Sequence, residues 1–409
     1  YLAMVTSVAS EKQTKRNQAS NKEELAYEDG VHLLRLSSMD HVTLLAGVGE
    51  YRALTFSDDS NHLAFMSNRD DYKAKSPSWS VYLTASQKPR VQQIATEGRD
   101  GIPSEWWIAP QSSLLFSDDS ARLYFDTVPI ADDVIEERKG RNSKNSSADK
   151  EKKAKLDLWH WKDPQLQPQQ LLRAQSEKSR TYQAAYSMGS KRVIQIERRA
   201  MPSVSVNYRS KASLAVANNT LPYRKSLSWD YPGFQDVYLV DLNTGAPTKV
   251  AEKVRWNASL SPEGKFITWF DAEKRQWFTQ STVGKNAKPV QVSKGIRHPL
   301  QDELHDTPNL PRPYGAAGWL ANDEALLIYD SYDIWQVDPT GKQSAKCLTL
   351  GAGRQQKIRF RYLRLDAEQI SIDPNETILL SAFNAKTKAS GYFQLSSRGE
   401  SKLPELPPK

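Results

Sequence analysis

The chain has 409 residues, a formal net charge of +8 and a mean hydropathy of −0.66. No apolar run approaches the roughly 18 residues that a helix needs to cross a bilayer. The single cysteine, Cys347, excludes a disulfide framework and a cysteine metal site, although it does not decide the compartment.

The two ends of the chain differ in composition from the rest. Residues 1–24 form a short apolar segment followed by a polar tether, without the basic and apolar regions of a signal peptide. Residues 401–409 are a Pro-rich run of linker type. Because the chain also does not begin with Met, we expect a processed or excised piece that more protein once followed.

A repeated phrase sets the architecture. Leu54–Ser67 returns as Leu114–Thr127, and each copy reads as strand, tight polar turn, strand. Ser and Asp favour such a turn because their side chains bond nearby backbone groups. The two copies share eight residues: Leu54/Leu114, Phe56/Phe116, Ser57/Ser117, Asp58/Asp118, Asp59/Asp119, Ser60/Ser120, Leu63/Leu123 and Phe65/Phe125.

Degenerate copies follow along the chain, at Leu260–Trp269, Leu320–Tyr329 and Ile372–Leu380, with a weaker one at Tyr186–Ile196. Each copy precedes a second strand pair, marked by short β-type runs such as Val81–Leu83, Leu158–Trp161, Val237–Val240 and Ile334–Val337. Four strands per repeat with no helical period between them predict an all-β chain, a β-propeller of four-stranded blades. The alternative is an ordinary β-sandwich with chance similarity.

The pattern assigns residues 25–400 to the propeller. We expect blades near 27–45 (partial), 51–94, 108–172, 182–250, 256–292, 315–350 and 358–395. Six full blades and one blade split between the two ends would make seven. If the region 200–229 is itself a blade, the count becomes eight.

Two segments are predicted to be insertions. The highly charged segment 137–155 would lie between the strands Leu123–Thr127 and Leu158–Trp161. Since it has almost nothing apolar, we predict a solvated loop rather than a polyanion-binding arm, and no nucleic-acid partner. The segment Ala200–Trp229 is predicted to be a small hairpin or a lid over one rim.

Catalytic motifs are missing from the sequence. No two glycines are four or five residues apart, which excludes a Gly-x-Ser-x-Gly elbow and a P-loop. The polar run His298–Asp306 is interpreted as a hydrogen-bonded loop rather than a metal site, and His160 as structural. Asp58 and Asp118 are interpreted as turn residues, because the turn recurs. We therefore assign no catalytic, cofactor-binding or metal-binding residue.

Two longer phrases point to a family. Leu156–Asp163 with Leu166–Gln170 resembles the second blade of the large bacterial serine peptidases of the prolyl oligopeptidase family. Asp306–Trp319 followed by Tyr329–Trp335 resembles a later blade of the same enzymes. The resemblance covers most of residues 27–395, and the general blade phrase resembles the Tol-type repeat.

In that family an N-terminal propeller caps a C-terminal α/β-hydrolase domain that carries Ser, Asp and His. The resemblance therefore implies a non-catalytic propeller that selects peptide substrates, with the hydrolase domain as its partner and an exported, periplasmic location. No triad residue can be placed on this chain, so whether it is itself an enzyme stays open. The alternatives are a stand-alone periplasmic protein-binding platform and a propeller enzyme, such as a lyase or glycosidase, with its site in the central channel.

Overall fold

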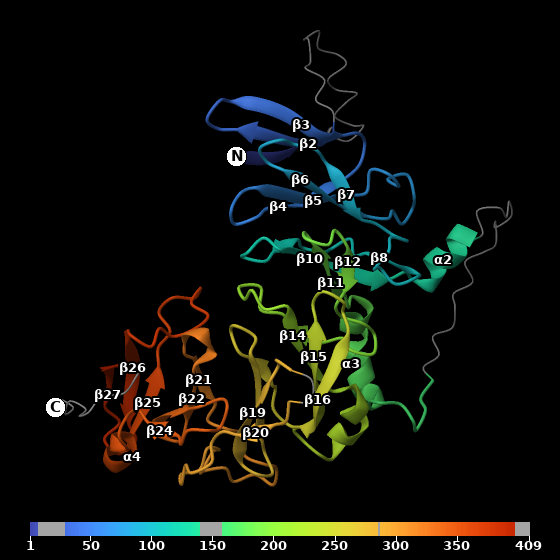
Figure 1. Ribbon diagram of the computed structural model, residues 1–409. Coiled ribbons are helices and arrows are strands. Elements are labelled where there is room, and N and C mark those ends of the chain that lie inside the picture. Colours follow the sequence, from blue (N-terminus) through green and yellow to red (C-terminus); the bar gives the residue numbers. More distant parts are fainter. Residues whose placement is uncertain (7–28, 140–157, 285–286, 397–409) are drawn as a thin grey trace. The chain divides into compact units, whose positions relative to one another are not determined.

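The computed structural model describes residues 1–6, 29–139, 158–284 and 287–396. The chain divides into two compact units, which we describe separately (Figure 1). Unit 1 holds residues 1–162, 167–199 and 242–245, and unit 2 holds 163–166, 200–241 and 246–409. Among the described residues, none of the helices has the length and apolar character that crossing a bilayer requires.

Unit 1 contains three antiparallel sheets. Sheet 1 has the order β1 (Leu2–Thr6), β2 (Gly30–Arg35), β3 (Asp40–Ala46). Sheet 2 has the order β4 (Tyr51–Phe56), β5 (His62–Ser67), β6 (Ser80–Ala85), β7 (Gln92–Ala95). Sheet 3 comprises β8 (Trp106–Ile108), β9 (Leu115–Phe116), β10 (Arg122–Pro129), β11 (Tyr182–Ser187) and β12 (Val193–Gln195). Helices α2 (Asp132–Lys139) and α3 (Gln167–Lys178) lie between β10 and β11 in the sequence.

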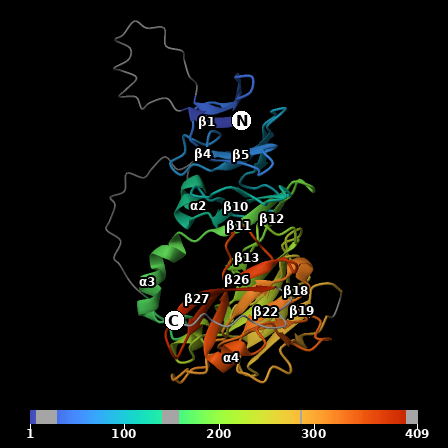
Figure 2. The ribbon, with the colours of Figure 1, turned by 90° about the vertical axis from the view of Figure 1, so that its left-hand side faces the viewer.

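The three sheets of unit 1 stack in chain order (Figures 1 and 2). Val31 of sheet 1 packs on Tyr51, Phe65 and Tyr82 of sheet 2. A larger apolar cluster joins sheet 2 to sheet 3, with members such as Met66 and Phe125. The hydroxyl of Thr55 also donates to the carbonyl of Leu114, 3.2 Å away. Face-to-face packing of successive meanders is the arrangement of neighbouring propeller blades.

Unit 2 contains four more sheets, so the described residues form seven in all. Sheet 4 is β13 (Val204–Ser205), β14 (Leu214–Asn219), β15 (Gln235–Asp241) and β16 (Pro247–Val254). Sheet 5 is β17 (Ser259–Leu260), β18 (Phe266–Asp271), β19 (Gln276–Ser281) and β20 (Val290–Gln291). Sheet 6 is β21 (Ala316–Trp319), β22 (Leu326–Tyr329), β23 (Ile334–Val337) and β24 (Lys346–Cys347). Sheet 7 is β25 (Ile358–Tyr362), β26 (Thr377–Asn384) and β27 (Ser390–Ser396).

Specific hydrogen bonds join each sheet of unit 2 to the next. Between sheets 4 and 5, the Asn218 amide bonds both the N–H and the C=O of Ala258. Between sheets 5 and 6, buried Asp323 accepts from the Ser261 hydroxyl and from two backbone N–H groups of the β17–β18 turn. Asp323 belongs to the 3₁₀ turn η3 (Ala321–Asp323).

One of the contacts between sheets 6 and 7 is made by main-chain atoms, beside side-chain contacts such as the bond from the Tyr362 N–H to the Tyr329 hydroxyl. Ile372 lies in the connection between β25 and β26, and its N–H donates to Trp319 while its C=O accepts from Ala321. Both bonds measure 2.8 Å. They form an isolated parallel bridge between Leu320 and Ile372. A side chain is therefore not needed to fix this contact, and its register depends on backbone geometry.

The repeated phrase forms the expected strand–turn–strand unit. In the first copy the Ser57 hydroxyl donates to Asp59 at 2.5 Å, and Asp59 accepts from the Asn61 N–H. The second copy repeats these bonds with Ser117 and Asp119. Ser60 and Ser120 take the left-handed conformation, with φ of 56° and 55°, that closes such a turn. The all-β propeller prediction is confirmed at the level of its sheets, and the number of blades stays a prediction.

The expected strand at Leu158–Trp161 is wrong. These residues are in a loop and turn, and Leu158, Trp159 and Trp161 are exposed. The strands that complete sheet 3 are instead β11 and β12, with Tyr182 paired to Thr127. The expected blade limits 108–172 and 182–250 are therefore replaced by 106–195 and 204–254. The cause is that a short alternating run without a partner strand has no means of burying its apolar face.

The predicted insertions also need correction. The part of 200–229 expected to be a hairpin or lid supplies β13 and β14 of sheet 4, so it is not a blade of its own. The remainder is the 3₁₀ helix η2 (Leu221–Ser228), in the connection to β15. Most of the charged segment 137–155, most of the tether 1–24 and the linker 401–409 lie outside the described residues. The apolar start of the chain is strand β1, paired to β2.

Candidate functional site

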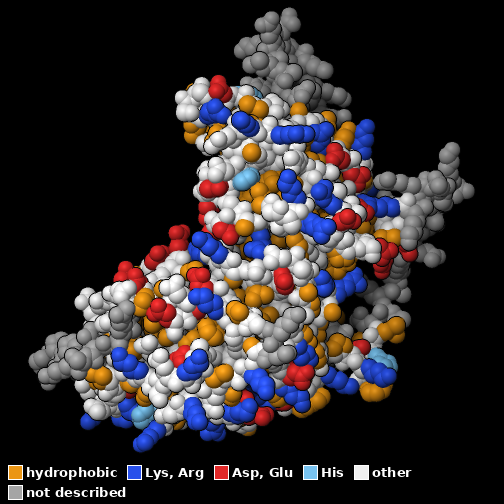
Figure 3. Space-filling model, in the orientation of Figure 1, with side chains coloured by type: hydrophobic (Ala, Val, Ile, Leu, Met, Phe, Trp, Pro, Cys, Tyr) orange, Lys and Arg blue, Asp and Glu red, His pale blue; other side chains and the backbone are white. Residues whose placement is uncertain are grey.

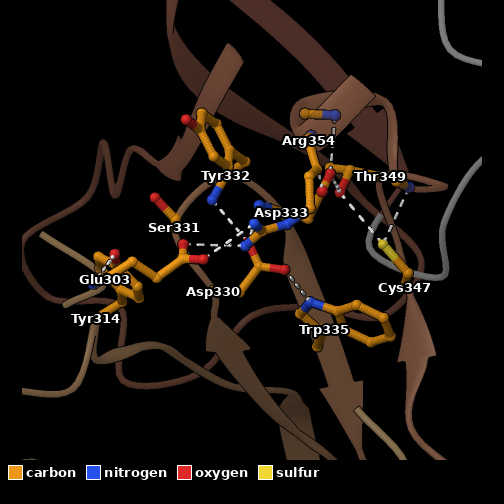
Figure 4. Close-up of polar contacts among 12 residues, drawn as sticks. Glu303, Tyr314, Asp330, Ser331, Tyr332, Asp333, Trp335, Cys347, Thr349 and Arg354 are labelled. Atoms are coloured by element: carbon orange, nitrogen blue, oxygen red, sulfur yellow. Dashed lines mark hydrogen bonds and ion pairs between the residues drawn. The ribbon is translucent and has the colours of Figure 1, made fainter. Parts of the chain in front are cut away.

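The turn between β22 and β23 is organised by a buried carboxylate. Asp330 has no exposed surface and accepts from the backbone N–H of Tyr332 at 2.7 Å and of Asp333 at 2.8 Å (Figure 4). Its other oxygen accepts from the indole N–H of Trp335 at 2.9 Å. A buried carboxylate needs such donors because an unpaired charge is costly in the interior. These residues belong to the second family-like phrase.

A second buried carboxylate fixes the next segment. Asp333 accepts from the hydroxyl of Thr349 at 2.6 Å and from the backbone N–H groups of Gly353 at 2.9 Å and Arg354 at 3.0 Å. Both N–H groups belong to α4 (Ala352–Gln356). Burial raises the pKa of Asp333, and the neighbouring charge of Asp330 raises it further. Asp333 thus holds α4 against the β22–β23 turn.

Arg354 links the carboxylates of Asp330 and Asp333 to the segment that precedes sheet 6 in the sequence. Its guanidinium makes a bidentate pair with Glu303 at 3.1 and 3.2 Å and lies 3.6 Å from Asp330. It also lies over the ring of Tyr332, 5.2 Å from the centroid. Burial opposes its charge, but Glu303 and Asp330 outweigh this effect and raise the pKa of Arg354. The cluster is therefore an anchoring network, and none of its groups is arranged as a nucleophile with a base.

Cys347, the single thiol, lies at the edge of this network. Its sulfur accepts from the Gly351 N–H at 3.2 Å and lies 3.6 Å from the Thr349 hydroxyl. Burial raises the pKa of Cys347, which keeps it as a protonated thiol. Because the thiolate is the reactive form, this cysteine is suited to packing rather than to nucleophilic chemistry.

A groove of about 340 Å³ lies between the outer strand of sheet 4 and the β18–β19 hairpin of sheet 5. Its apolar wall includes Phe234, Trp269 and Phe278, and the last two rings stack with centroids 6.0 Å apart. Charged residues from the end of β16 and from the hairpin turn line the rest. A concave surface lined by aromatic side chains with polar groups beside them is typical of ligand-binding sites.

The connection between β14 and β15 borders this groove. Arg255 lines the groove, lies 4.0 Å from the centroid of the Phe234 ring and pairs with Asp230 at 2.8 Å. In the same connection, Trp229 and Tyr231 are 73% and 60% exposed. Two large aromatic side chains without cover beside an aromatic groove are available for contact with another molecule.

The structure places the predicted polar residues in ordinary structural roles. His305 Nε2 lies 2.7 Å from the carbonyl of Asn309 and 3.0 Å from the Thr307 hydroxyl, so this loop is hydrogen-bonded as expected. His298 lies against Trp335 instead, 6.2 Å between ring centroids. His160 accepts from the N–H of Lys162 in a turn, not on the strand that we expected.

Sequence reasoning missed the groove. Asp58 and Asp118 lie in the repeated turns as expected, and the side-chain bonds of these turns come from the next residues, Asp59 and Asp119. The groove is assembled from four separate segments of the sequence, and Trp269 and Phe278 are indistinguishable in sequence from blade-core residues. The sequence feature that could have indicated the groove is the pair Trp229 and Tyr231, two aromatic residues in an otherwise polar connection.

Several solved structures are similar to this chain in fold. No protein-family model matches the sequence, and no curated protein matches it. Among the similar structures are β-propeller domains of prolyl oligopeptidase-family peptidases. The β-propeller domain of the Trilobed protease from Pyrococcus furiosus is 14% identical, covering 93% of this chain and 89% of that one, with a TM-score of 0.31.

Two longer peptidases are also similar. Dipeptidyl peptidase 4 of Porphyromonas gingivalis is 11% identical, with 91% and 49% coverage and a TM-score of 0.37. Acylaminoacyl peptidase of Pyrococcus horikoshii is 12% identical, with 95% and 49% coverage and a TM-score of 0.31. The chain thus spans about half the length of these two enzymes. At these identities and TM-scores the similarity concerns the fold, and activity has to be argued from the chain itself.

Proposed function

We propose that this chain is the substrate-selecting propeller of an exported serine peptidase of the prolyl oligopeptidase family. Peptide hydrolysis would occur in a separate α/β-hydrolase domain, and the propeller would restrict entry to extended peptides. The observation that carries the proposal is the second family-like phrase. Its members Tyr314, Asp330, Asp333 and Trp335 all enter the network that joins sheet 6 to its neighbours.

The chemistry available on the chain supports a selecting role rather than a catalytic one. The sequence lacks the glycine spacing of a nucleophile elbow. The thiol of Cys347 is held protonated because burial raises its pKa. Selection would instead depend on shape and charge, through the aromatic groove of sheet 4 and the connection that carries Trp229 and Tyr231.

A second function is favoured by a different observation. Leu158, Trp159, Trp161, Leu171 and Leu172 of unit 1 are all more than half exposed, although they lie within fifteen residues of sequence. Exposed large apolar side chains, where they adjoin on a surface, mark protein-binding sites. They would suit a stand-alone propeller that acts as a protein-binding platform, without any hydrolase domain.

Labelling of the native protein in its source cell separates the two functions. A fluorophosphonate probe reacts with an activated serine, so it marks serine hydrolases. We expect a labelled band of roughly twice the 46.3 kDa of this chain, since a hydrolase domain of similar size would be attached. An unlabelled band near 46 kDa would overturn the peptidase function and favour the platform.

The selecting role has its own experiment in the full-length enzyme. Residues 220–234 connect β14 to β15, which are adjacent antiparallel strands with Asn219 paired to Asp236. An Asn-Gly dipeptide, which with Gln235 makes a three-residue hairpin loop, can therefore replace residues 220–234 without changing the sheet. We expect the shortened enzyme to cleave longer peptides than the wild type, while kcat for a dipeptide substrate stays the same. The matched control is Tyr392→Ala, at another exposed aromatic residue. Unchanged size limits would refute the role of this connection.

A further inference from the structure

A pocket of about 280 Å³ lies in unit 1, between sheets 2 and 3. Two turns that are far apart in sequence form it, the β6–β7 turn with Lys88 and Arg90 and the β11–β12 turn with Lys191. The apolar part of its lining comes from buried Leu83 and Tyr186, with Met188 beside them. The pocket therefore combines an apolar floor with cations from two sheets.

The charge of this pocket is uncompensated. No Asp or Glu is among its lining residues. Within the described part of the chain, the side chains of Lys88, Arg90 and Lys191 make no ion pair and no hydrogen bond. By contrast, Arg138, another cation of unit 1, pairs with both Glu97 and Asp71. Across the face shown in Figure 3, basic and acidic side chains are interspersed.

Two buried polar atoms, one in the lining of the pocket and one next to a lining residue in sequence, also lack a hydrogen-bond partner among the described residues. His62 lines the pocket, and its Nδ1 is buried without a hydrogen-bond partner among the described residues. The buried hydroxyl of Ser86, next to the residue that pairs with His62, also has none. The carboxylate that interacts with His62 is Asp59, which is already bonded to Ser57 and Asn61 within its own turn. Buried polar atoms normally have a partner, so these two need an explanation.

We propose that this pocket binds an anionic group, a carboxylate or a phosphate, carried by a ligand with a small apolar part. The anion would lie among the three cations, and the apolar part would pack on Leu83, Tyr186 and Met188. Charge-assisted bonds from Lys and Arg are the usual means of holding such anions. A volume of about 280 Å³ fits one amino-acid-sized ligand or the end of a peptide. The proposal does not depend on the peptidase function.

Calorimetric titration of the complete chain at low ionic strength tests the proposal. The probes are N-acetyl-leucine, its neutral analogue N-acetyl-leucinamide, and inorganic phosphate as a competitor. We expect the carboxylate to bind at least about tenfold more tightly than the amide, because only the charged group meets the cations. Raising the salt concentration should weaken binding, since exposed charges are screened. If phosphate displaces N-acetyl-leucine, the pocket binds both kinds of anion. If phosphate has no effect on the binding of N-acetyl-leucine, the pocket is selective for carboxylates.

Point variants locate the site. Lys191→Ala and Arg90→Gln should each weaken carboxylate binding by about three- to tenfold. The matched control is Lys342→Ala, an exposed lysine of unit 2 outside the pocket. Thermal unfolding of each variant checks that it is folded. Equal binding of the acid and the amide, no binding of either anion, or an equal loss in Lys342→Ala would overturn the proposal.

Discussion

Replacing Asp333 with alanine should loosen the junction between sheet 6 and α4. The carboxylate accepts three hydrogen bonds, from the Thr349 hydroxyl and from the N–H groups of Gly353 and Arg354. Removing the carboxylate leaves these three donors without an acceptor, and water does not reach them easily because Asp333 is fully buried. Each such donor costs about 1–3 kcal/mol, and the costs are not additive, so we expect about 3–5 kcal/mol in local opening free energy.

Amide hydrogen exchange followed by mass spectrometry measures this loss where it occurs. A loss of about 3 kcal/mol corresponds to roughly a hundredfold faster exchange, because each 1.4 kcal/mol is about tenfold. The peptide that contains Gly353 and Arg354 should show it. Thr349→Val removes only one of the three donors and should lower the local opening free energy by about 1 kcal/mol. In the control Asp306→Ala, at an exposed carboxylate, this free energy should stay within about 0.5 kcal/mol of the wild-type value. Exchange in Asp333→Ala that matches the control would refute the anchoring role.

Two further predictions concern unit 1. Gly101→Ala should lower the free energy of unfolding by about 3 kcal/mol or more, because the φ of Gly101 is +95° and a Cβ there would lie 2.0 Å from the carbonyl oxygen of Val193. The control Gly98→Ala, at a residue with φ of +74° and open space around it, should lower it by only about 1–2 kcal/mol. Equal melting temperatures for the two variants would contradict this prediction. The Ser57 hydroxyl and the N–H groups of Asn61 lower the pKa of Asp59 from 3.8 to about 2. Because the folded state binds this proton less strongly than the unfolded state, the bonds of Asp59 contribute stability above about pH 4, and this contribution is lost as the pH falls through 2. In NMR titrations, Ser57→Ala should move the midpoint of Asp59 back towards 3.8, and an unchanged midpoint would be evidence against the bond.

The repeated turns were predictable because their signal is local. Ser57 and Asp59 bond to atoms within five residues of themselves, and the same letters recur in the second copy. The sheets with short connections, such as β4–β7 and β17–β20, were found for the same reason. Their strands alternate and lie next to their partners in the sequence.

The errors arose where partners are distant. Tyr182 pairs with Thr127 across a connection of more than fifty residues, so nothing near either strand identifies the other. Trp159 and Trp161 alternate with polar residues as a strand would, but no partner strand covers them. The pocket lined by Lys88, Arg90 and Lys191 could not be predicted for a related reason. Lys88 and Lys191 lie about a hundred residues apart in the sequence and come together only through the packing of sheets 2 and 3.

The main-chain bridge at Ile372 has a mechanical consequence. A load applied to β27 is carried through β26 to the connection that contains Ile372, and from there through two backbone hydrogen bonds to Trp319 and Ala321. Once β27 has been detached, pulling further on β26 therefore also pulls on sheet 6. Under force, the two sheets should yield together in one step rather than in two, which a single-molecule pulling trace would display as one longer extension.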